Sequence, residues 1–95
     1  MEPPMVPPPV RVTLIGRNGC HLCEVARATV ERVTAELGVG WEERDVDGDP
    51  ELLERWSDQV PVTLVDGRQH DYWRVDEARL RTALASPRAE APPGL

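Results

Sequence analysis

The sequence has no lysine and no phenylalanine, and only two of its 95 residues are cysteines. All 11 cationic side chains are arginines. The absence of lysine excludes a lysine Schiff base and the lysine of a phosphate-binding P-loop. The absence of phenylalanine leaves Trp41, Trp56, Tyr72 and Trp73 as the aromatic side chains. We expect at least two of the tryptophans to pack in the core, and the alternative role for them is to line a substrate groove.

Long apolar runs are also missing from the sequence. The longest wholly apolar stretches are far shorter than the roughly 20 residues that a membrane-spanning helix needs. The segment Met1–Pro4 has neither a cationic start nor an apolar core, so we expect no secretory signal peptide. These observations predict a cytoplasmic protein in a reducing compartment.

The formal net charge is −6. This balance argues against a general nucleic-acid surface and against a polybasic membrane anchor. We therefore expect neither a nucleic-acid partner nor a membrane partner. The length suits one small domain, because 95 residues cannot bury two independent cores. We expect this domain to be a monomer.

Proline is concentrated near the two ends of the chain. Five of the first ten residues are prolines, and three more follow residue 86. Neither end shows an apolar period, so residues 1–9 and 86–95 are predicted to be disordered tails. The folded domain is then expected at residues 10–85.

The first half of this domain reads as strand, helix and strand. Residues 10–15 are rich in β-branched side chains and stop at Gly16, which predicts a strand. Residues 20–37 follow a helical period, with Gly38 as the residue that ends the helix. The apolar stripe of that helix consists of Leu22, Ala26, Val30, Val33 and Leu37. Residues 41–46 are predicted to form a polar strand at or near a sheet edge.

The second half reads as helix, hairpin and helix. Asp49 is a good N-cap for a helix that starts at Pro50 and runs to about residue 57. Strands are predicted at 62–65 and 68–74, joined by Asp66-Gly67 as a type I′ turn. Asp76 is expected to cap a last helix that runs to about residue 85, with Val75 and Leu80 as a hydrophobic staple.

The resulting order is β-α-β-α-β-β-α, which places the chain in the α/β class. The helix between the first two strands is long enough for a parallel βαβ crossover. The last two strands form an antiparallel hairpin. A mixed four-stranded sheet with helices on both faces accommodates every element.

Cys20 and Cys23 stand where the first strand hands over to the helix. Unpaired backbone N–H groups and the helix dipole at this end stabilise a thiolate over a thiol. The thiolate is the nucleophilic form, so Cys20 is the candidate nucleophile. Cys23 lies nearly one turn later on the same side and can attack a mixed disulfide on Cys20. This placement predicts thiol–disulfide exchange.

Four segments of the sequence resemble the glutaredoxin-like branch of the thioredoxin superfamily. They are Val12–Ile15 followed by Cys20-His21-Leu22-Cys23, Asp45-Val46-Asp47 with Asp49–Leu52, Val60-Pro61-Val62, and Val65-Asp66-Gly67. The resemblance covers about residues 10–85 and implies a thioredoxin-like fold. It is strongest to a set of small glutaredoxin-like proteins.

The resemblance also implies roles for individual residues. Cys20 would be the attacking cysteine and Cys23 the resolving one. Pro61 would be a cis proline facing the sulfurs, and Val60 would offer backbone hydrogen bonds to a thiol substrate. On the residues alone, an ordinary trans proline ahead of an edge strand stays open at Pro61. The implied activity is that of a thiol–disulfide oxidoreductase in cell redox homeostasis.

No bound cofactor is required for this activity. The implied substrates are disulfides of proteins or small molecules, and a low-molecular-weight thiol such as glutathione, or a reductase, would supply electrons. The sequence departs from familiar glutaredoxins at two places. No proline or glycine stands between Cys20 and Cys23, and 73–76 replace the Gly-Gly and acidic pair that many glutaredoxins use for glutathione. The resemblance therefore supports the family's fold and thiol chemistry for this protein better than it supports the family's substrate.

Two polar residues beside the cysteines are candidate substrate-binding residues. His21, as a cation, would stabilise the Cys20 thiolate, and the alternative is an exposed histidine at a variable position. Arg17 would attract a carboxylate of a thiol substrate or stabilise the thiolate, and the alternative is a solvated surface arginine. His70 has no visible partner in the sequence and is expected on the surface.

Two other classes of function compete with this interpretation. A CxxC pair is half of a zinc site, or the soft-ion site of a small copper chaperone. Zinc generally needs four ligands and only His21 and His70 remain as soft ones, so we expect no metal ligand here. The second alternative is a non-catalytic adaptor or redox sensor that shares the fold.

Overall fold

The computed structural model describes residues 9–86, and the elements follow the predicted order. The elements are β1 (Val10–Gly16), α1 (His21–Leu37), β2 (Gly40–Asp45), the short 3-10 helix η1 (Val46–Gly48), α2 (Pro50–Trp56), β3 (Val62–Val65), β4 (Arg68–Tyr72) and α3 (Glu77–Ala85). Apart from residues 9 and 86, the two predicted disordered tails lie outside the described residues. Within residues 9–86, no helix is long and apolar enough to cross a membrane.

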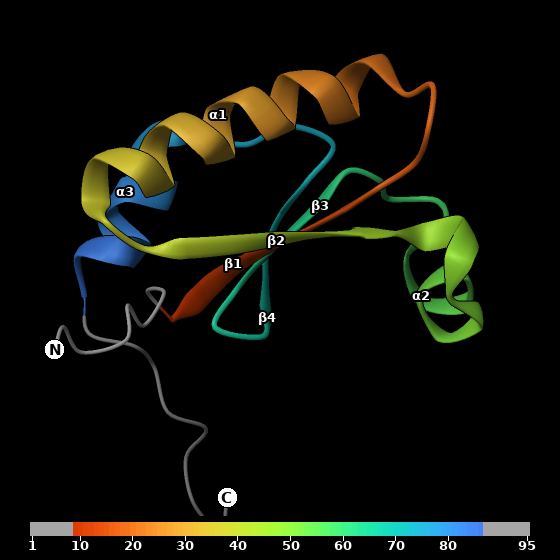
Figure 1. Cartoon of the computed structure of the whole chain (residues 1–95). Coiled ribbons are helices and arrows are strands. Elements are labelled where there is room, and N and C mark those ends of the chain that lie inside the picture. The colour runs from red at the N-terminus through yellow and green to blue at the C-terminus, as the bar shows by residue number, and fades with distance from the viewer. Residues whose placement is uncertain (1–8, 87–95) are drawn as a thin grey trace, which may run out of the picture.

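One mixed four-stranded sheet has the order β2-β1-β3-β4. β1 pairs with β2 in parallel and with β3 antiparallel, and β4 closes the hairpin. The polar strand β2 lies at an edge, as predicted. Figure 1 shows α1 and α3 on one side of this sheet and α2 on the other, beyond the end of β2. The predicted fold class is confirmed.

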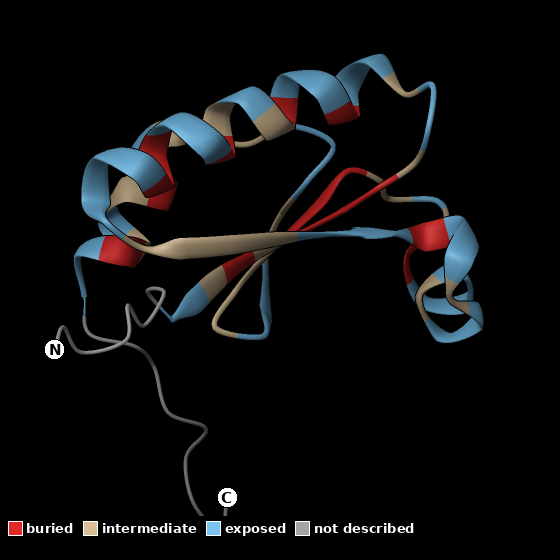
Figure 2. Ribbon diagram, in the orientation of Figure 1, coloured by how far each residue is buried: buried red, intermediate tan, exposed pale blue. Residues whose placement is uncertain are grey.

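The core is divided between the two faces of the sheet. Successive side chains of a strand point to opposite faces. Val12 of β1 packs against α1 and α3, and Ile15 packs on the α2 side. The first cluster contains Val12, Val30, Val33, Leu80 and Leu84, and the second contains Ile15, Val46, Trp56 and Val62. Figure 2 shows buried residues on the inner face of α1, in the middle strands, in α3 and in the η1–α2 region.

The apolar stripe of α1 is buried only in its middle. Leu22 and Leu37 are 39% and 40% exposed, whereas Val30 is fully buried. Steps of four residues overshoot one turn by about 40°, so Leu22 lies well round the helix from Val30. Leu37 is the last residue of the helix. Leu22 therefore remains available at the surface near the two cysteines.

The helix ends follow the predicted capping residues. Gly38 adopts a left-handed conformation with φ of 69° and ends α1. The Asp49 side chain accepts hydrogen bonds from the backbone of Glu51 and Leu52, and Asp76 accepts one from Arg79. The polar side chains at these positions satisfy backbone N–H groups that a helix cannot pair internally.

The last strand is shorter than predicted. β4 ends at Tyr72, whereas the sequence pattern continued to Arg74. Trp73 has a φ of 64°, which is incompatible with a strand. Its backbone N–H turns to the carbonyl of Pro61, at 2.7 Å. The chain therefore leaves the sheet at Trp73 and crosses toward α3.

The β3–β4 hairpin turns through Asp66 and Gly67, with φ of 52° and 82°. Positive φ at both positions is what a type I′ turn requires. The Asp66 carboxylate accepts two hydrogen bonds from the Arg11 guanidinium, at 3.0 and 2.9 Å. Arg11 also donates to the carbonyls of Leu84 and Ser86. This arginine therefore joins β1, the hairpin and the end of α3.

We expect Asp66→Asn to lower the free energy of unfolding by about 3 kcal/mol, because it leaves the Arg11 charge buried without its partner. The two side chains are only 10% and 4% exposed. Asparagine tolerates positive φ, so the turn itself is preserved. Urea unfolding measures the change. Asp47→Asn, which breaks the exposed Arg17–Asp47 pair, is the control and should cost much less. Equal losses in the two variants would contradict this account.

Candidate active site

Cys20 is the N-cap of α1. Its backbone is extended, with φ of −98° and ψ of 113°, and its sulfur accepts a hydrogen bond from the backbone N–H of Cys23 at 3.2 Å. Its carbonyl accepts from the N–H of Glu24. The sulfur thus takes the place that a serine or aspartate oxygen usually occupies at a helix start. A backbone donor aimed at this sulfur stabilises negative charge on it.

Cys23 lies inside the molecule, while Cys20 is partly exposed, and both are free thiols. Burial raises the pKa of Cys23 to about 11, with a further contribution from its hydrogen bond to Cys20. The backbone N–H of Arg17 and the charge of Arg27 act in the opposite direction. The pair is therefore asymmetric. One sulfur is accessible at the helix start, and the other is a buried thiol that holds its proton at neutral pH.

Gly16 explains how Cys23 comes so close to the sheet. This last residue of β1 is buried, and the position where a Cβ would stand lies 3.4 Å from the Cys23 sulfur. The same position lies 3.7 Å from an oxygen of Glu43. A larger side chain at residue 16 would occupy the space between the sulfur, β2 and the first turn of α1.

The Val60–Pro61 peptide bond is cis, as the resemblance implied. Pro61 is buried and Val60 is half-buried, just ahead of β3. The carbonyl of Pro61 accepts the N–H of Trp73. This loop and the Trp73 segment are therefore held together. The contact of Pro61 with the sulfurs and the hydrogen bonding of Val60 to substrate stay predictions.

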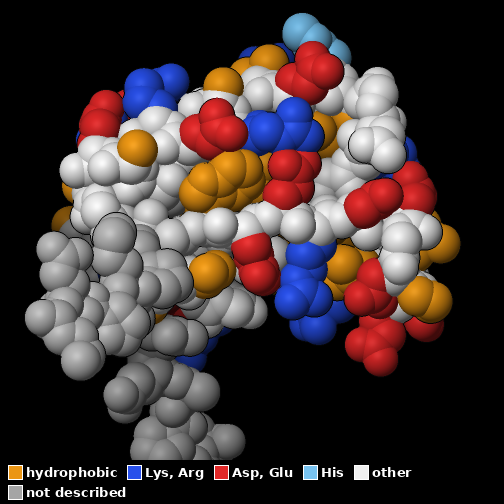
Figure 3. Space-filling view, viewed as in Figure 1, with side chains coloured by type: hydrophobic (Ala, Val, Ile, Leu, Met, Phe, Trp, Pro, Cys, Tyr) orange, Lys and Arg blue, Asp and Glu red, His pale blue; other side chains and the backbone are white. Residues whose placement is uncertain are grey.

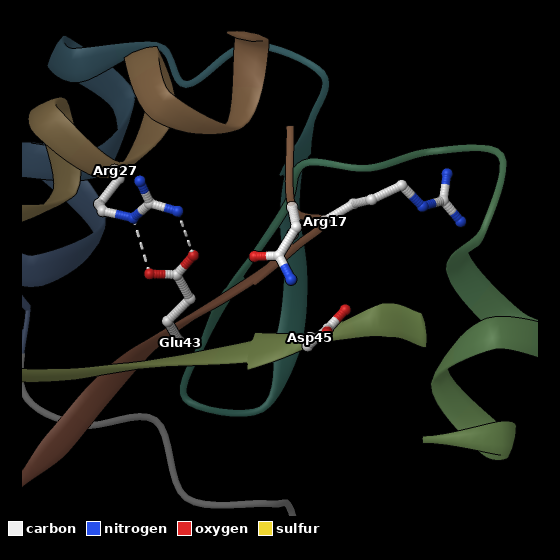
Figure 4. A pocket seen from close by; sticks show the side chains of 6 residues that line it. Arg17, Arg27, Glu43 and Asp45 are labelled. Atoms are coloured by element: carbon white, nitrogen blue, oxygen red, sulfur yellow. Dashed lines mark hydrogen bonds and ion pairs between the residues drawn. The ribbon is translucent and has the colours of Figure 1, made fainter. Parts of the chain in front are cut away.

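Arg17 follows β1 and its guanidinium is paired with Asp47. The two hydrogen bonds measure 2.9 and 3.1 Å, and the pair is exposed. The arginine holds the pKa of Asp47 below its usual value. Figure 4 shows the Arg17 side chain extending away from Arg27 and Glu43. Binding of a substrate carboxylate by Arg17 stays a prediction, and it requires the Asp47 pair to open.

A cavity of about 380 Å³ lies below the start of α1, lined by Gly16, Arg17, Asn18, Arg27, Glu43 and Asp45. Arg27 of α1 donates two hydrogen bonds to Glu43 of β2, at 2.7 and 2.5 Å (Figure 4). This ion pair was not singled out by the sequence, because residues 27 and 43 meet only when the first βαβ unit folds. The positive charge of Arg27 acts to lower the pKa of Cys23, against the larger effect of burial.

The two histidines have different surroundings. His21 is exposed and lines a groove beside the start of α1. His70 was expected on the surface, but its side chain is only 12% exposed. Burial lowers the pKa of His70. The sequence could not show this burial, because every residue of β4 before Tyr72 is polar and no apolar alternation marks the face of the strand that turns inward.

The rest of the described surface carries charged side chains but no cluster of metal-ligating ones. Within residues 9–86, no group of three or more His, Cys, Asp or Glu side chains could hold a metal ion. On the face shown in Figure 3, acidic side chains are interspersed with arginines rather than separated into a basic area. The cysteine pair and its flanking groove are thus the chemically distinctive part of the described structure.

The model of one protein family, the glutaredoxin-like domain (DUF836), matches residues 11–85. The chain belongs to this glutaredoxin-like family. The match spans nearly the whole region that was predicted to fold, and the family resemblance inferred from the sequence is confirmed.

Other proteins are similar to this glutaredoxin-like protein over most of their length. It is 39% identical over 88 residues to an uncharacterized protein of Mycobacterium tuberculosis, covering 87% of this chain and 91% of the relative. The solution structure of a protein from X. campestris is similar, with 33% identity and a TM-score of 0.64 over 84% of this chain and all of that one.

The thioredoxin fold is shared with more distant proteins. A chloroplastic thioredoxin z matches with a TM-score of 0.61 and 18% identity, over 78% of this chain and 74% of its own. At that identity the likeness shows the fold alone. Two cysteines at CxxC spacing on a glutaredoxin-like thioredoxin fold are therefore what the comparisons and the geometry together show.

Proposed function

We propose that this glutaredoxin-like protein is a thiol–disulfide oxidoreductase with Cys20 as nucleophile and Cys23 as resolving cysteine. The observation that carries the proposal is the asymmetry of the pair. Cys20 caps α1 and accepts a backbone N–H, while Cys23 is buried directly behind it. An accessible sulfur with a stabilised negative charge suits the first attack, and a sheltered second thiol suits the release step.

The first step is attack of the Cys20 thiolate on one sulfur of a substrate disulfide. A Cys20–substrate disulfide forms, and the other substrate sulfur leaves as a thiolate that takes a proton from solvent. Cys23 then loses its proton, and its thiolate attacks the Cys20 sulfur. The Cys20–Cys23 disulfide forms and the second substrate thiol leaves. The substrate gains two electrons, and the protein loses two.

The reverse electron flow restores the dithiol. A low-molecular-weight thiol, glutathione or its equivalent, or a protein reductase would supply the two electrons. No bound cofactor takes part in these steps. Val60 and Pro61 are assigned to the backbone contact with the extended substrate, and His21 to the exposed side of the sulfur. Arg17 is assigned to a substrate carboxylate. We place this activity in redox homeostasis of a reducing compartment, the cytoplasm.

A redox titration of the metal-free protein tests this function first. Thiol trapping reads the state of Cys20 and Cys23 at each potential. We expect a reversible two-electron midpoint between about −300 and −120 mV, the range of known thiol–disulfide exchangers. Failure to form the internal disulfide, or metal that arrives bound to the two sulfurs, would contradict the proposal and favour a metal or binding module.

A further inference from the structure

A groove of about 420 Å³ opens beside the nucleophile. Its walls come from the first two turns of α1 and from the segment that joins β4 to α3, which runs behind α1 in Figure 1. The side chains that matter here are Leu22, Val25 and Ala26 on one wall and Trp73, Arg74 and Val75 on the other. Leu22 and Val25 flank Cys23 in the sequence, so the groove starts within one helical turn of the reactive pair.

Two of the large apolar side chains that line this groove are well exposed. Trp73 is 51% exposed and Val25 is 53% exposed. Tyr72 continues the surface and contacts the Trp73 ring edge-on, with 5.1 Å between the ring centres. Large apolar side chains gathered on one exposed face mark binding surfaces more often than isolated ones do.

Trp73 is held in place at a conformational cost. A bulky residue with a φ of 64° is a genuine outlier, and such conformations cluster at ligand-binding positions. Its backbone N–H is fixed by Pro61 and its indole N–H donates to the carbonyl of Asp58, at 3.3 Å. These two bonds hold the half-exposed Trp73, which lines the groove, outside the core.

We propose that this groove binds a polypeptide segment that carries the substrate disulfide, with a bulky apolar residue next to the reacting cysteine and a carboxylate nearby. The inference deepens the proposed function, because it names the substrate class of the same site. The apolar side chain inserts between Leu22, Val25 and Trp73, and the carboxylate pairs with Arg74. Within residues 9–86, no carboxylate forms an ion pair with Arg74.

The side chains that line the groove favour this peptide over a glutathione molecule. Glutathione carries two carboxylates and an ammonium group but no bulky apolar side chain. The groove is lined by five apolar side chains and by three polar ones, His21, Thr29 and Arg74. A polar tripeptide would leave these apolar walls uncovered, while burial of one leucine-sized side chain favours binding by roughly tenfold or more.

The test compares two peptide disulfides that carry the same glutamate and differ only in leucine or serine beside the cysteine. We expect the protein to show a kcat/KM about tenfold higher for the leucine peptide, and higher than for glutathione disulfide. Trp73→Gly, which relieves the positive φ, and Leu22→Ser should each bring the leucine-to-serine ratio close to one. Leu37→Ser, at the other end of α1 with equal exposure, is the matched control and should keep the ratio.

A ratio near one in the unaltered protein, or a ratio unchanged in Trp73→Gly, would overturn the groove assignment. So would a preference for glutathione disulfide. Concentration-dependent dimerisation that Leu22→Ser abolishes would assign the groove to a second copy of the chain instead.

Two further measurements distinguish failure of the proposed function from failure of the groove assignment. Turnover of bis(2-hydroxyethyl) disulfide reports the thiol chemistry without the groove. Binding of the two peptides, with their cysteines S-methylated, is followed by the chemical shift of the Trp73 indole N–H. If the small disulfide is not turned over while the leucine peptide alone shifts this signal, the oxidoreductase proposal fails and the groove stands. If neither peptide shifts it, the groove assignment fails.

Discussion

Cys20→Ser is expected to lower kcat/KM for disulfide reduction by more than about a thousandfold, because a serine hydroxyl cannot form the mixed disulfide on which both later steps depend. The fold should be kept, since serine is a preferred N-cap and its oxygen can accept the Cys23 N–H in place of sulfur. Loss of activity with an unchanged unfolding midpoint is therefore the expected result.

Cys23→Ser is the partner variant and should behave differently. The first attack by Cys20 proceeds, but no resolving thiol follows, so one substrate half stays attached. Intact-protein mass spectrometry after mixing with a peptide disulfide should show this adduct on Cys23→Ser and none on Cys20→Ser. Disulfide reduction at full rate by Cys20→Ser, or an adduct on Cys23, would show that the two roles are wrongly assigned.

The fold could be predicted because local signals and global packing agree. Asp49, Asp76 and Gly38 mark helix ends through hydrogen bonds and a left-handed residue that act within a few positions of each cap. Asp66-Gly67 fixes the hairpin by the same local logic. Interactions of short sequence range leave a readable signature, and the order of strands then follows from few topological choices.

The features that escaped prediction depend on contacts between distant residues. Trp73 leaves the strand because its N–H finds Pro61, and no pattern within 68–74 announces that bond. Arg17 forms an ion pair with Asp47, which lies 30 positions away in the sequence. Trp56 packs in the core while Trp73 stays at the surface, although the sequence offered both for either role. Composition limits how many aromatic residues are buried, but only the fold decides which.

Two of the residues in these contacts bear on the candidate site, because Trp73 lines the groove and the charge of Arg27 acts on Cys23. Pro61 and Trp73 are bonded to each other, and Arg27 reaches from α1 to β2 beside Cys23. The motif alone specifies which sulfur is near the helix end. The surrounding contacts determine how buried the second sulfur is and which surface a substrate meets, and both consequences can be measured.

The rate of the resolving step should rise about tenfold for each pH unit between pH 6 and pH 9, a total of about a thousandfold. The attacking species is the Cys23 thiolate, and burial raises the pKa of Cys23 to about 11. Below a pKa the deprotonated fraction grows tenfold per unit, so a raised pKa moves this rise to higher pH. Burial, the largest cause, persists when Cys20 is part of a mixed disulfide, although the contribution from the Cys20 hydrogen bond does not.

A disulfide of two aromatic thiols that absorb as thiolates separates the two steps in one experiment. The first thiolate released reports the attack by Cys20, and the second reports attack by Cys23 on the mixed disulfide. The rate of the second phase should keep rising with pH up to pH 9 without reaching a plateau. This phase should be absent from Cys23→Ser. A plateau near pH 7 would mean that a neighbouring charge, with Arg27 the first candidate, outweighs the burial of the resolving thiol.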